Sequence, residues 1–318
     1  MPRACGQEPP RGKCPSGVEQ LTIFGPGLIG GSIALGAKAR GLARRVVAID
    51  RNGGQKYTPS ERDRVADEWL AASDERAVSR AYEASELIVL ACPVHSIIAE
   101  LPRALSSGAV VTDAGSTKEL IVRAAEKHPG AERFVAGHPM AGHPAGGLIH
   151  ASPDLFVDKR WLLCSPDAAK SAQAKVIELA RGLGAIIVEL DASAHDQSVA
   201  LTSHVPQLYA SALAALAAER DATAAAGPGF ASATRVAGGA EGIWRDIFET
   251  NGSAIAEVLG LLSAELDAVA AALRRGDAEE ALKLLERARR TKRGSEQSLP
   301  QDELLRAFAV SSQSPPSR

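Results

Sequence analysis

The chain of 318 residues lacks the features that mark membrane, secreted or nucleic-acid-binding proteins. It has no run of 18 apolar residues, which argues against a membrane-spanning helix. Residues 1–17 are rich in Pro, Gly and Arg and lack the apolar segment of a signal peptide. The formal net charge is −2, and no basic tract indicates nucleic acid binding. We therefore expect a cytoplasmic protein that acts on a small molecule.

Cysteine is also scarce, with four residues in the chain. Cys5 and Cys14 lie in the N-terminal leader, whereas Cys92 and Cys164 lie in apolar, strand-like runs. No pair has the spacing of a zinc site or a CxxC motif. We interpret Cys92 and Cys164 as small core residues in a reducing compartment, and we expect no metal site.

What the sequence does contain is an alternation of short apolar runs and helical patterns over residues 18–191. This alternation predicts an α/β fold, with an N-terminal Rossmann-type domain built on a mostly parallel sheet. A helix is expected directly after Gly27. The other predicted helices are residues 96–105, 117–127 and 168–182, and the predicted strands are residues 21–24, 46–50, 87–92, 109–113, 133–137, 161–164 and 186–190.

Residues 192–293 have a different pattern, in which apolar residues recur three or four positions apart and no strand-like run appears. We predict an all-α second domain there. Residues 1–17 and 294–318 are expected to be a disordered leader and a largely disordered tail.

Residues 25–30 read Gly-Pro-Gly-Leu-Ile-Gly and match G-x-G-x-x-G between a strand and a helix. Such a turn brings backbone amides and a helix N-terminus to a pyrophosphate. Asp50 ends the next strand 20 positions after Gly30, where a ribose-binding carboxylate is expected, so NAD is favoured. Arg51 leaves NADP open. This motif assigns the cofactor site to Gly25, Gly27, Leu28, Ile29, Gly30, Asp50 and Arg51.

Two polar residues follow later strands, at the edge of the sheet where ligands bind. His138 lies between Gly137 and Pro139, and a neutral imidazole there can accept a hydroxyl proton as hydride leaves. Ser116 precedes a predicted helix and can present its hydroxyl to a ligand. A capping role for either side chain remains the alternative.

Several segments together resemble the prephenate/arogenate dehydrogenase family over about residues 20–291. These segments are Gly25–Ser32, Cys92-Pro93-Val94, Thr112–Lys118, Gly137–Gly142, His195-Asp196, Ser203–Pro206, Gly229-Phe230, Thr234-Arg235 and Trp244–Ile247. The resemblance implies oxidative decarboxylation of a cyclohexadienol, arogenate or prephenate, with NAD or NADP, in tyrosine biosynthesis. It also implies a homodimer formed through the helical domain, and it adds Cys92 and Pro93 to the cofactor site.

By the same resemblance, His138 is the catalytic group at the ring hydroxyl, and Ser116 bridges that hydroxyl and the cofactor. Arg235 would pair with a substrate carboxylate, a role that suits the planar guanidinium group. His195-Asp196 is interpreted as a stabiliser of the junction between the domains.

The sequence departs from the family at two places. Residues 143–147 read His-Pro-Ala-Gly-Gly, which changes a loop of the substrate pocket in relatives and makes His143 a candidate contact. Gln207 stands where the family has a histidine, and a neutral amide favours the ammonium group of arogenate. His204 is either a core histidine or a pocket residue, and we assign it to the pocket because Pro206 interrupts the helix beside it. The substrate set is therefore Arg235, His204, Gln207 and His143.

Other functions remain open at this point. One is a dehydrogenase of a related cyclohexadiene in secondary metabolism, such as 4-amino-4-deoxyprephenate. Another is a β-hydroxyacid dehydrogenase or an imine or ketone reductase, but residues 196–219 lack the lysine expected on that helix. A silent NAD(P)-binding sensor would not need His138, Ser116 and Arg235 together.

Overall fold

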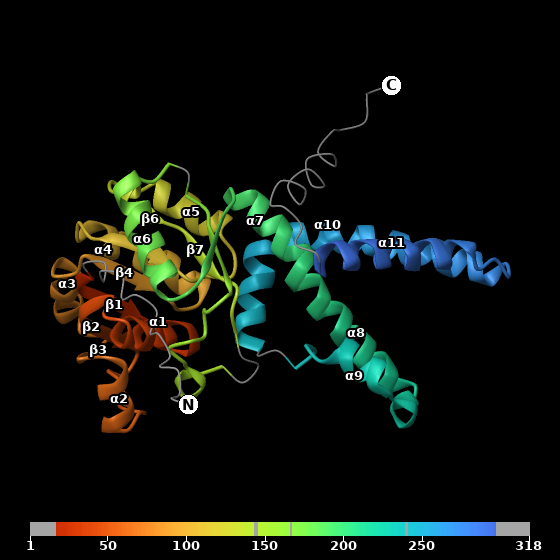
Figure 1. Ribbon diagram of the computed structural model, residues 1–318, viewed down its shortest axis with the longest axis horizontal. Helices are drawn as coiled ribbons and strands as arrows, with labels where there is room; N and C mark the ends of the chain where they lie inside the picture. The colour runs from red at the N-terminus through yellow and green to blue at the C-terminus, as the bar shows by residue number, and fades with distance from the viewer. Residues whose placement is uncertain (1–16, 143–145, 166, 239–240, 297–318) are drawn as a thin grey trace, which may run out of the picture. The chain divides into compact units, whose positions relative to one another are not determined.

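The computed structural model describes residues 17–142, 146–165, 167–238 and 241–296 (Figure 1). The chain forms two compact units, which meet in sequence between Ala256 and Glu257. Among the described residues, no helix is long and apolar enough to cross a membrane.

The first unit is built on a six-stranded sheet in which all pairings are parallel. The strand order is β3-β2-β1-β4-β5-β6, the order of a dinucleotide-binding fold whose direction changes between β1 and β4. Its central strands are continuous apolar runs because both of their faces are buried. The strands are β1 (Val18–Phe24), β2 (Ala43–Asp50), β3 (Glu68–Ala71), β4 (Leu87–Leu90), β5 (Val110–Asp113) and β6 (Phe134–Val135).

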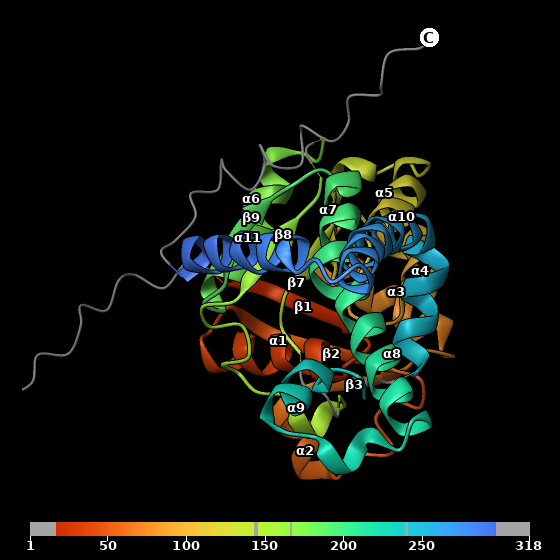
Figure 2. The ribbon, with the colours of Figure 1, turned by 90° about the vertical axis from the view of Figure 1, so that its right-hand side faces the viewer.

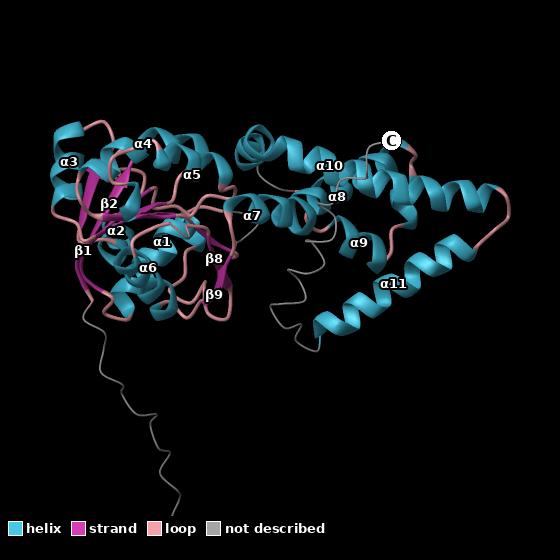
Figure 3. Cartoon of the chain, turned by 90° about the horizontal axis from the view of Figure 1, so that it is seen from above, coloured by secondary structure: helices cyan, strands magenta, loops and turns pink. Residues whose placement is uncertain are grey.

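Helices cover both faces of this sheet, as Figure 3 shows. One apolar cluster joins the sheet to α1 (Leu28–Ala39), α2 (Pro59–Val65) and α6 (Lys170–Gly182). A second cluster joins it to α3 (Glu75–Glu83), α4 (Val94–Ser106) and α5 (Glu119–Glu126). The predicted Rossmann-type fold is confirmed. The region containing α2, β3 and α3 was not predicted.

A second, three-stranded sheet departs from the prediction. The strand expected over residues 133–137 is present but ends at Val135 as β6 of the large sheet, whereas β7 (Gly137–Pro139) pairs with β8 (Arg160–Leu163) in the second sheet. β8 in turn pairs with β9 (Ile186–Glu189), which α6 contacts (Figure 2). The strand divides because the amide of Gly137 donates to the Asp113 carboxylate instead of continuing the first ladder.

The region after β9 is helical. Its helices are α7 (Ala192–Val199), α8 (Val205–Glu219), α9 (Pro228–Thr234), α10 (Glu241–Arg274) and α11 (Glu279–Glu296), with a short 3-10 turn at Ala222–Ala225. Two further 3-10 turns, Ala131–Arg133 and Leu148–His150, lie before β9. A π-helical segment, Ala200–His204, joins α7 to α8. Pro206 follows this segment. The wider π-helical turn accommodates its ring, which cannot fit an ordinary α-helical turn.

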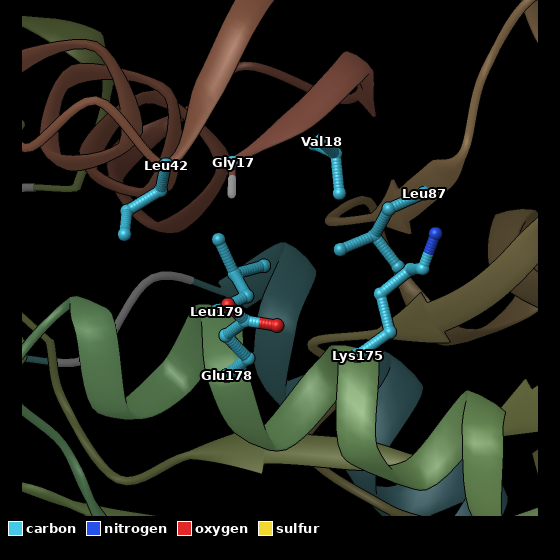
Figure 4. A pocket seen from close by; sticks show the side chains of 7 residues that line it. All are labelled: Gly17, Val18, Leu42, Leu87, Lys175, Glu178 and Leu179. Carbon is cyan, nitrogen blue, oxygen red and sulfur yellow. The ribbon is translucent and has the colours of Figure 1, made fainter. Parts of the chain in front are cut away.

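A small hollow opens at the amino end of β1 (Figure 4). Gly17, Val18, Leu42, Leu87, Lys175, Glu178 and Leu179 line it. Because ligands bind at the carboxyl ends of the strands in this architecture, we assign the hollow no role in catalysis.

Candidate active site

The glycine turn after β1 has the geometry that a dinucleotide requires. Gly25 has a φ of +89°, which a residue with a side chain rarely adopts. A Cβ on Gly30 would lie 2.4 Å from the Gly25 carbonyl oxygen, so only glycine lets α1 approach β1 this closely. A Cβ on Gly27 would meet nothing within 4 Å, and Gly27 is the N-cap of α1, which has no side-chain cap. The helix N-terminus at Gly27 is therefore open to a pyrophosphate, and Leu28 and Ile29 form its first turn.

Asp50 ends β2 and has a carboxylate oxygen that lacks a hydrogen-bond partner. Its side chain is 14% exposed, and its buried Oδ2 has no hydrogen-bond partner. A ribose hydroxyl would satisfy this oxygen, so the residues present fit a dinucleotide. Lys56 Nζ lies 3.7 Å from the same oxygen, a neighbour that the sequence patterns did not reveal. Arg51 is exposed beside it.

Cys92 and Pro93 follow β4, the strand next to β1. A Cβ on Gly25 would lie 3.1 Å from the Cys92 Cβ, so this segment lies against the glycine turn. Pro93 precedes the first residue of α4. Burial raises the pKa of the Cys92 thiol to about 12, so the thiol stays protonated and unreactive.

Ser116 lies in the loop between β5 and α5. Helix α5 begins at Glu119, two residues later than predicted, so Ser116 is not its N-cap. The Asp196 carboxylate accepts from the amides of Lys118 (2.7 Å) and Glu119 (3.0 Å) and serves as the cap instead. The Ser116 hydroxyl is partly exposed and makes no hydrogen bond with another described residue, so it is available to a ligand.

A buried ion pair supports this loop. The side chains of Lys118 and Asp113 are both fully buried and paired, and Lys118 Nζ also donates to the Gly137 carbonyl oxygen at 2.8 Å. Asp113 accepts from the amides of Gly115 (2.8 Å) and Gly137 (3.0 Å). The pair therefore holds both the backbone before Ser116 and the backbone before His138.

His138 lies on β7 and forms a chain with two residues at the start of the helical region. Its Nδ1 lies 2.9 Å from His195 Nε2, and His195 Nδ1 lies 2.8 Å from Asp196 Oδ1. His195 is fully buried and Asp196 is nearly so. The prediction that His195-Asp196 only stabilises a junction omitted this contact with the imidazole of His138.

The electrostatic environment keeps His138 neutral. Burial lowers its pKa well below the usual value of 6.5, and the nearby His195, Lys118 and His204 lower it further. Burial also lowers the pKa of His195, against the opposing effect of its bond to Asp196. A neutral imidazole near pH 7 is the form that can accept a proton.

His204 and Gln207 lie at the start of α8. His204 is 1% exposed, and burial lowers its pKa to about 4. Its Nδ1 lies 3.3 Å from Asn251 Nδ2, and the same amide donates to the Asp196 carbonyl oxygen at 2.8 Å. Gln207 is also buried, with Nε2 3.5 Å from Ser211 Oγ.

The remaining predicted residues are not joined to this group. Arg235 is exposed at the end of α9 and has no ion pair with another described residue. His143 lies outside the described residues. His95, which was not among the predicted site residues, lies on α4 and forms a half-exposed pair with Glu249 on α10, at 2.9 Å.

Sequence patterns missed the residues that support the site. Lys118 and Asp113 lie in the segment that indicated Ser116, but nothing in their spacing shows that both side chains are buried. Asn251 carries no motif, and its non-helical backbone appears only in the structure.

A dinucleotide cradle and a neutral histidine at one end of a parallel sheet meet two requirements of hydride transfer from an alcohol. The fold and the site thus define a class: a nicotinamide-dinucleotide-dependent dehydrogenase.

Comparison with known proteins gives the family. Residues 33–189 match the model for the prephenate dehydrogenase nucleotide-binding domain, and residues 191–287 match the prephenate dehydrogenase dimerization domain. Prephenate dehydrogenase of Bacillus subtilis (strain 168) is 30% identical over 275 residues, covering 82% of this chain and 72% of that protein. The chain belongs to the prephenate dehydrogenase family, so the predicted membership is confirmed.

Solved structures share the fold. Prephenate dehydrogenase from A. aeolicus, in complex with hydroxyphenyl propionate and NAD+, has a TM-score of 0.77 at 23% identity, covering 86% of this chain and 97% of that chain. Arogenate dehydrogenase of Synechocystis has a TM-score of 0.71 at 25% identity, covering 87% of this chain and 99% of that chain.

Proposed function

We propose that this dehydrogenase catalyses the NAD-dependent oxidative decarboxylation of a cyclohexadienol, arogenate or prephenate, to tyrosine or 4-hydroxyphenylpyruvate. The observation that carries the proposal is the state of His138. It is neutral and held through Nδ1 on the strand that follows the cofactor sheet, which leaves Nε2 to face a substrate hydroxyl. Membership of the prephenate dehydrogenase family supports the substrate class.

In this reaction His138 Nε2 accepts the proton of the ring hydroxyl, while Ser116 orients the same hydroxyl. When bound, NAD supplies the acceptor for the hydride from the hydroxyl-bearing carbon. The ring carboxylate then leaves as carbon dioxide, and its bonding electron pair completes the aromatic ring. His138 returns its proton to the phenolate oxygen, so the enzyme ends in its starting protonation state. The chain need mainly orient the substrate and hold one proton.

We assign substrate contacts to Arg235, His204, Gln207 and His143, with Arg235 pairing with a carboxylate. Gln207 is buried and uncharged, so it does not repel the ammonium group of arogenate. The neutral side chain at position 207 therefore favours arogenate over prephenate.

We also propose that two copies form a homodimer through the helical region. The second unit leaves large apolar side chains exposed: Leu261 (68%), Leu282 (54%), Leu273 (52%) and Leu285 (52%). Water contact of this extent indicates a partner surface. The match to a dimerization domain supports the proposal. Light scattering should give twice the mass of the chain, and a monomer at micromolar concentration would contradict it.

A substrate panel tests the reaction. Arogenate, prephenate and the amino-substituted prephenate are each mixed with NAD or NADP, and the absorbance of the reduced cofactor is followed. We expect the fastest turnover with arogenate and NAD. His138→Asn should lower kcat by about 10²-fold or more, whereas the exposed control His150→Asn should not. Cofactor binding without turnover of any substrate would overturn the assignment.

A further inference from the structure

The contacts of Asp196 determine where protons lie along the chain to His138. Its carboxylate accepts from the amides of Lys118 and Glu119 at the N-terminus of α5, where the helix dipole favours negative charge. A carboxylate that receives these donors is an acceptor only. His195 Nδ1, 2.8 Å from Asp196 Oδ1, must therefore carry a proton and donate it.

The position of the proton on His195 determines the position of the proton on His138. A neutral imidazole has one N–H and one lone pair. Because His195 carries its proton on Nδ1, its Nε2 is an acceptor. That Nε2 lies 2.9 Å from His138 Nδ1, which must therefore be the donor. The remaining nitrogen of His138, Nε2, then has a free lone pair.

We propose that His195 and Asp196 are positioning residues that fix His138 in the Nδ1–H tautomer and so make its Nε2 the proton acceptor. The inference rests on the proposed function for the role of His138, but the tautomer itself is a property of the free protein. Because the charged Asp196 can only accept, both histidines must donate toward it. A neutral partner able to donate would allow the reverse tautomers.

The same chain provides a place for positive charge during the reaction. As His138 Nε2 takes the hydroxyl proton, its Nδ1 proton moves to His195 Nε2, and both return when the phenolate is protonated. The transient imidazolium then lies on His195, which is paired with Asp196, instead of on His138. Burial and the nearby Lys118 lower the pKa of both imidazoles, but only His195 has a carboxylate partner, Asp196, that raises its pKa.

Nitrogen NMR of protein labelled with ¹⁵N-histidine tests the tautomer directly. Protonated and unprotonated ring nitrogens have well-separated chemical shifts, and the His138 signals are those lost in His138→Asn. We expect a protonated Nδ1 and an unprotonated Nε2 near pH 7 without any ligand. A protonated Nε2 on His138 would overturn the proposal.

Two substitutions of His195 distinguish its role as the acceptor for His138 Nδ1 from its role in stabilising the fold. In His195→Gln the amide oxygen can still accept from His138 Nδ1, whereas His195→Leu fills the space without an acceptor. Both variants lose the hydrogen bond from His195 Nδ1 to Asp196, so the thermal midpoint should fall to a similar extent in the two. We expect His195→Leu to shift His138 toward the Nε2–H tautomer and to lower kcat by about 10²-fold or more, with little change in KM or NAD affinity. His195→Gln should stay within about tenfold of the unaltered enzyme.

Equal tautomers and equal kcat in the two variants would overturn the proposal. If the unaltered protein turns over no cyclohexadienol, the proposed function fails, and the NMR spectra of the three proteins still decide the tautomer.

Discussion

Lys118 Nζ donates a hydrogen bond to the carbonyl oxygen of Gly137 at 2.8 Å, so a buried ammonium group holds the residue that precedes His138. The same ammonium group pairs with Asp113, which holds the amide of Gly115 before Ser116. One buried ion pair thus locates the two residues to which we assign catalysis.

Lys118→Met should destabilise the fold, because it leaves the Asp113 carboxylate buried without its partner. We expect the free energy of unfolding to fall by about 3–5 kcal/mol, measured by urea denaturation. Lys175→Met is the control: Lys175 and Glu86 are 31% and 43% exposed, and that substitution should cost about 1 kcal/mol or less. Similar losses of unfolding free energy in the two variants would show that the buried Lys118–Asp113 pair stabilises the fold no more than an exposed pair does.

The glycine turn allows folding and cofactor binding to be separated. Gly27→Ala adds a methyl group into open space on the cofactor side, so NAD affinity should fall by about tenfold or more while the thermal midpoint stays unchanged. Gly30→Ala places its methyl group against the Gly25 carbonyl and should lower the thermal midpoint. NAD binding by calorimetry and unfolding by circular dichroism are the measurements. Unaltered NAD affinity in Gly27→Ala would place the pyrophosphate elsewhere.

Asp50 and Lys56 should together set the choice between NAD and NADP. Asp50→Ser removes the carboxylate that repels a 2′-phosphate and leaves Lys56 to attract it. We expect NAD affinity to fall by about 1.5–3 kcal/mol, the value of a hydrogen bond to a charged group, and NADP affinity to rise. Adding Lys56→Met should remove the NADP gain. A gain that persists in the double variant would assign the phosphate contact to Arg51 instead.

His204 should make stability depend on pH. Its pKa is about 4 in the folded chain, below the usual value of 6.5, so the unfolded chain binds the additional proton between these values. The free energy of unfolding should therefore fall as pH falls from about 6.5 to 4, with His204 contributing about 3 kcal/mol. His204→Gln should flatten this part of the curve, whereas the exposed His150→Gln should not. A slope that His204→Gln leaves intact would contradict the pKa assignment.

Gln207→His should shift substrate preference toward prephenate. A histidine at this buried position can carry positive charge and attract a keto acid while repelling the ammonium group of arogenate. We expect the ratio of kcat/KM for prephenate to that for arogenate to rise by about tenfold, increasingly at lower pH. Gln207→Asn, which stays neutral, is the matched control. An unchanged ratio would refute the role assigned to Gln207.

The cofactor end of the molecule was predictable from local sequence. The roles of Gly25, Gly27 and Gly30 depend on backbone conformation within one turn, and Asp50 lies at a fixed spacing from them. The strand predicted over residues 133–137 was extended too far because its apolar pattern is continuous, while its end at Val135 depends on the Asp113 side chain, which accepts from the Gly137 amide. Residues 51–86 carry too weak a pattern for the short α2, β3 and α3 to be recognised.

The amino-acid sequence by itself determined the class of fold, the dinucleotide turn and the candidates His138 and Ser116, since each depends on neighbours close in the chain. Only the tertiary structure decided what surrounds them. His195 is 57 residues from His138, and Asp196 is 78 residues from Lys118, yet both pairs are in hydrogen-bond contact. Burial lowers the pKa of His138 in the folded chain alone, because removal of water is a property of packing and not of sequence spacing.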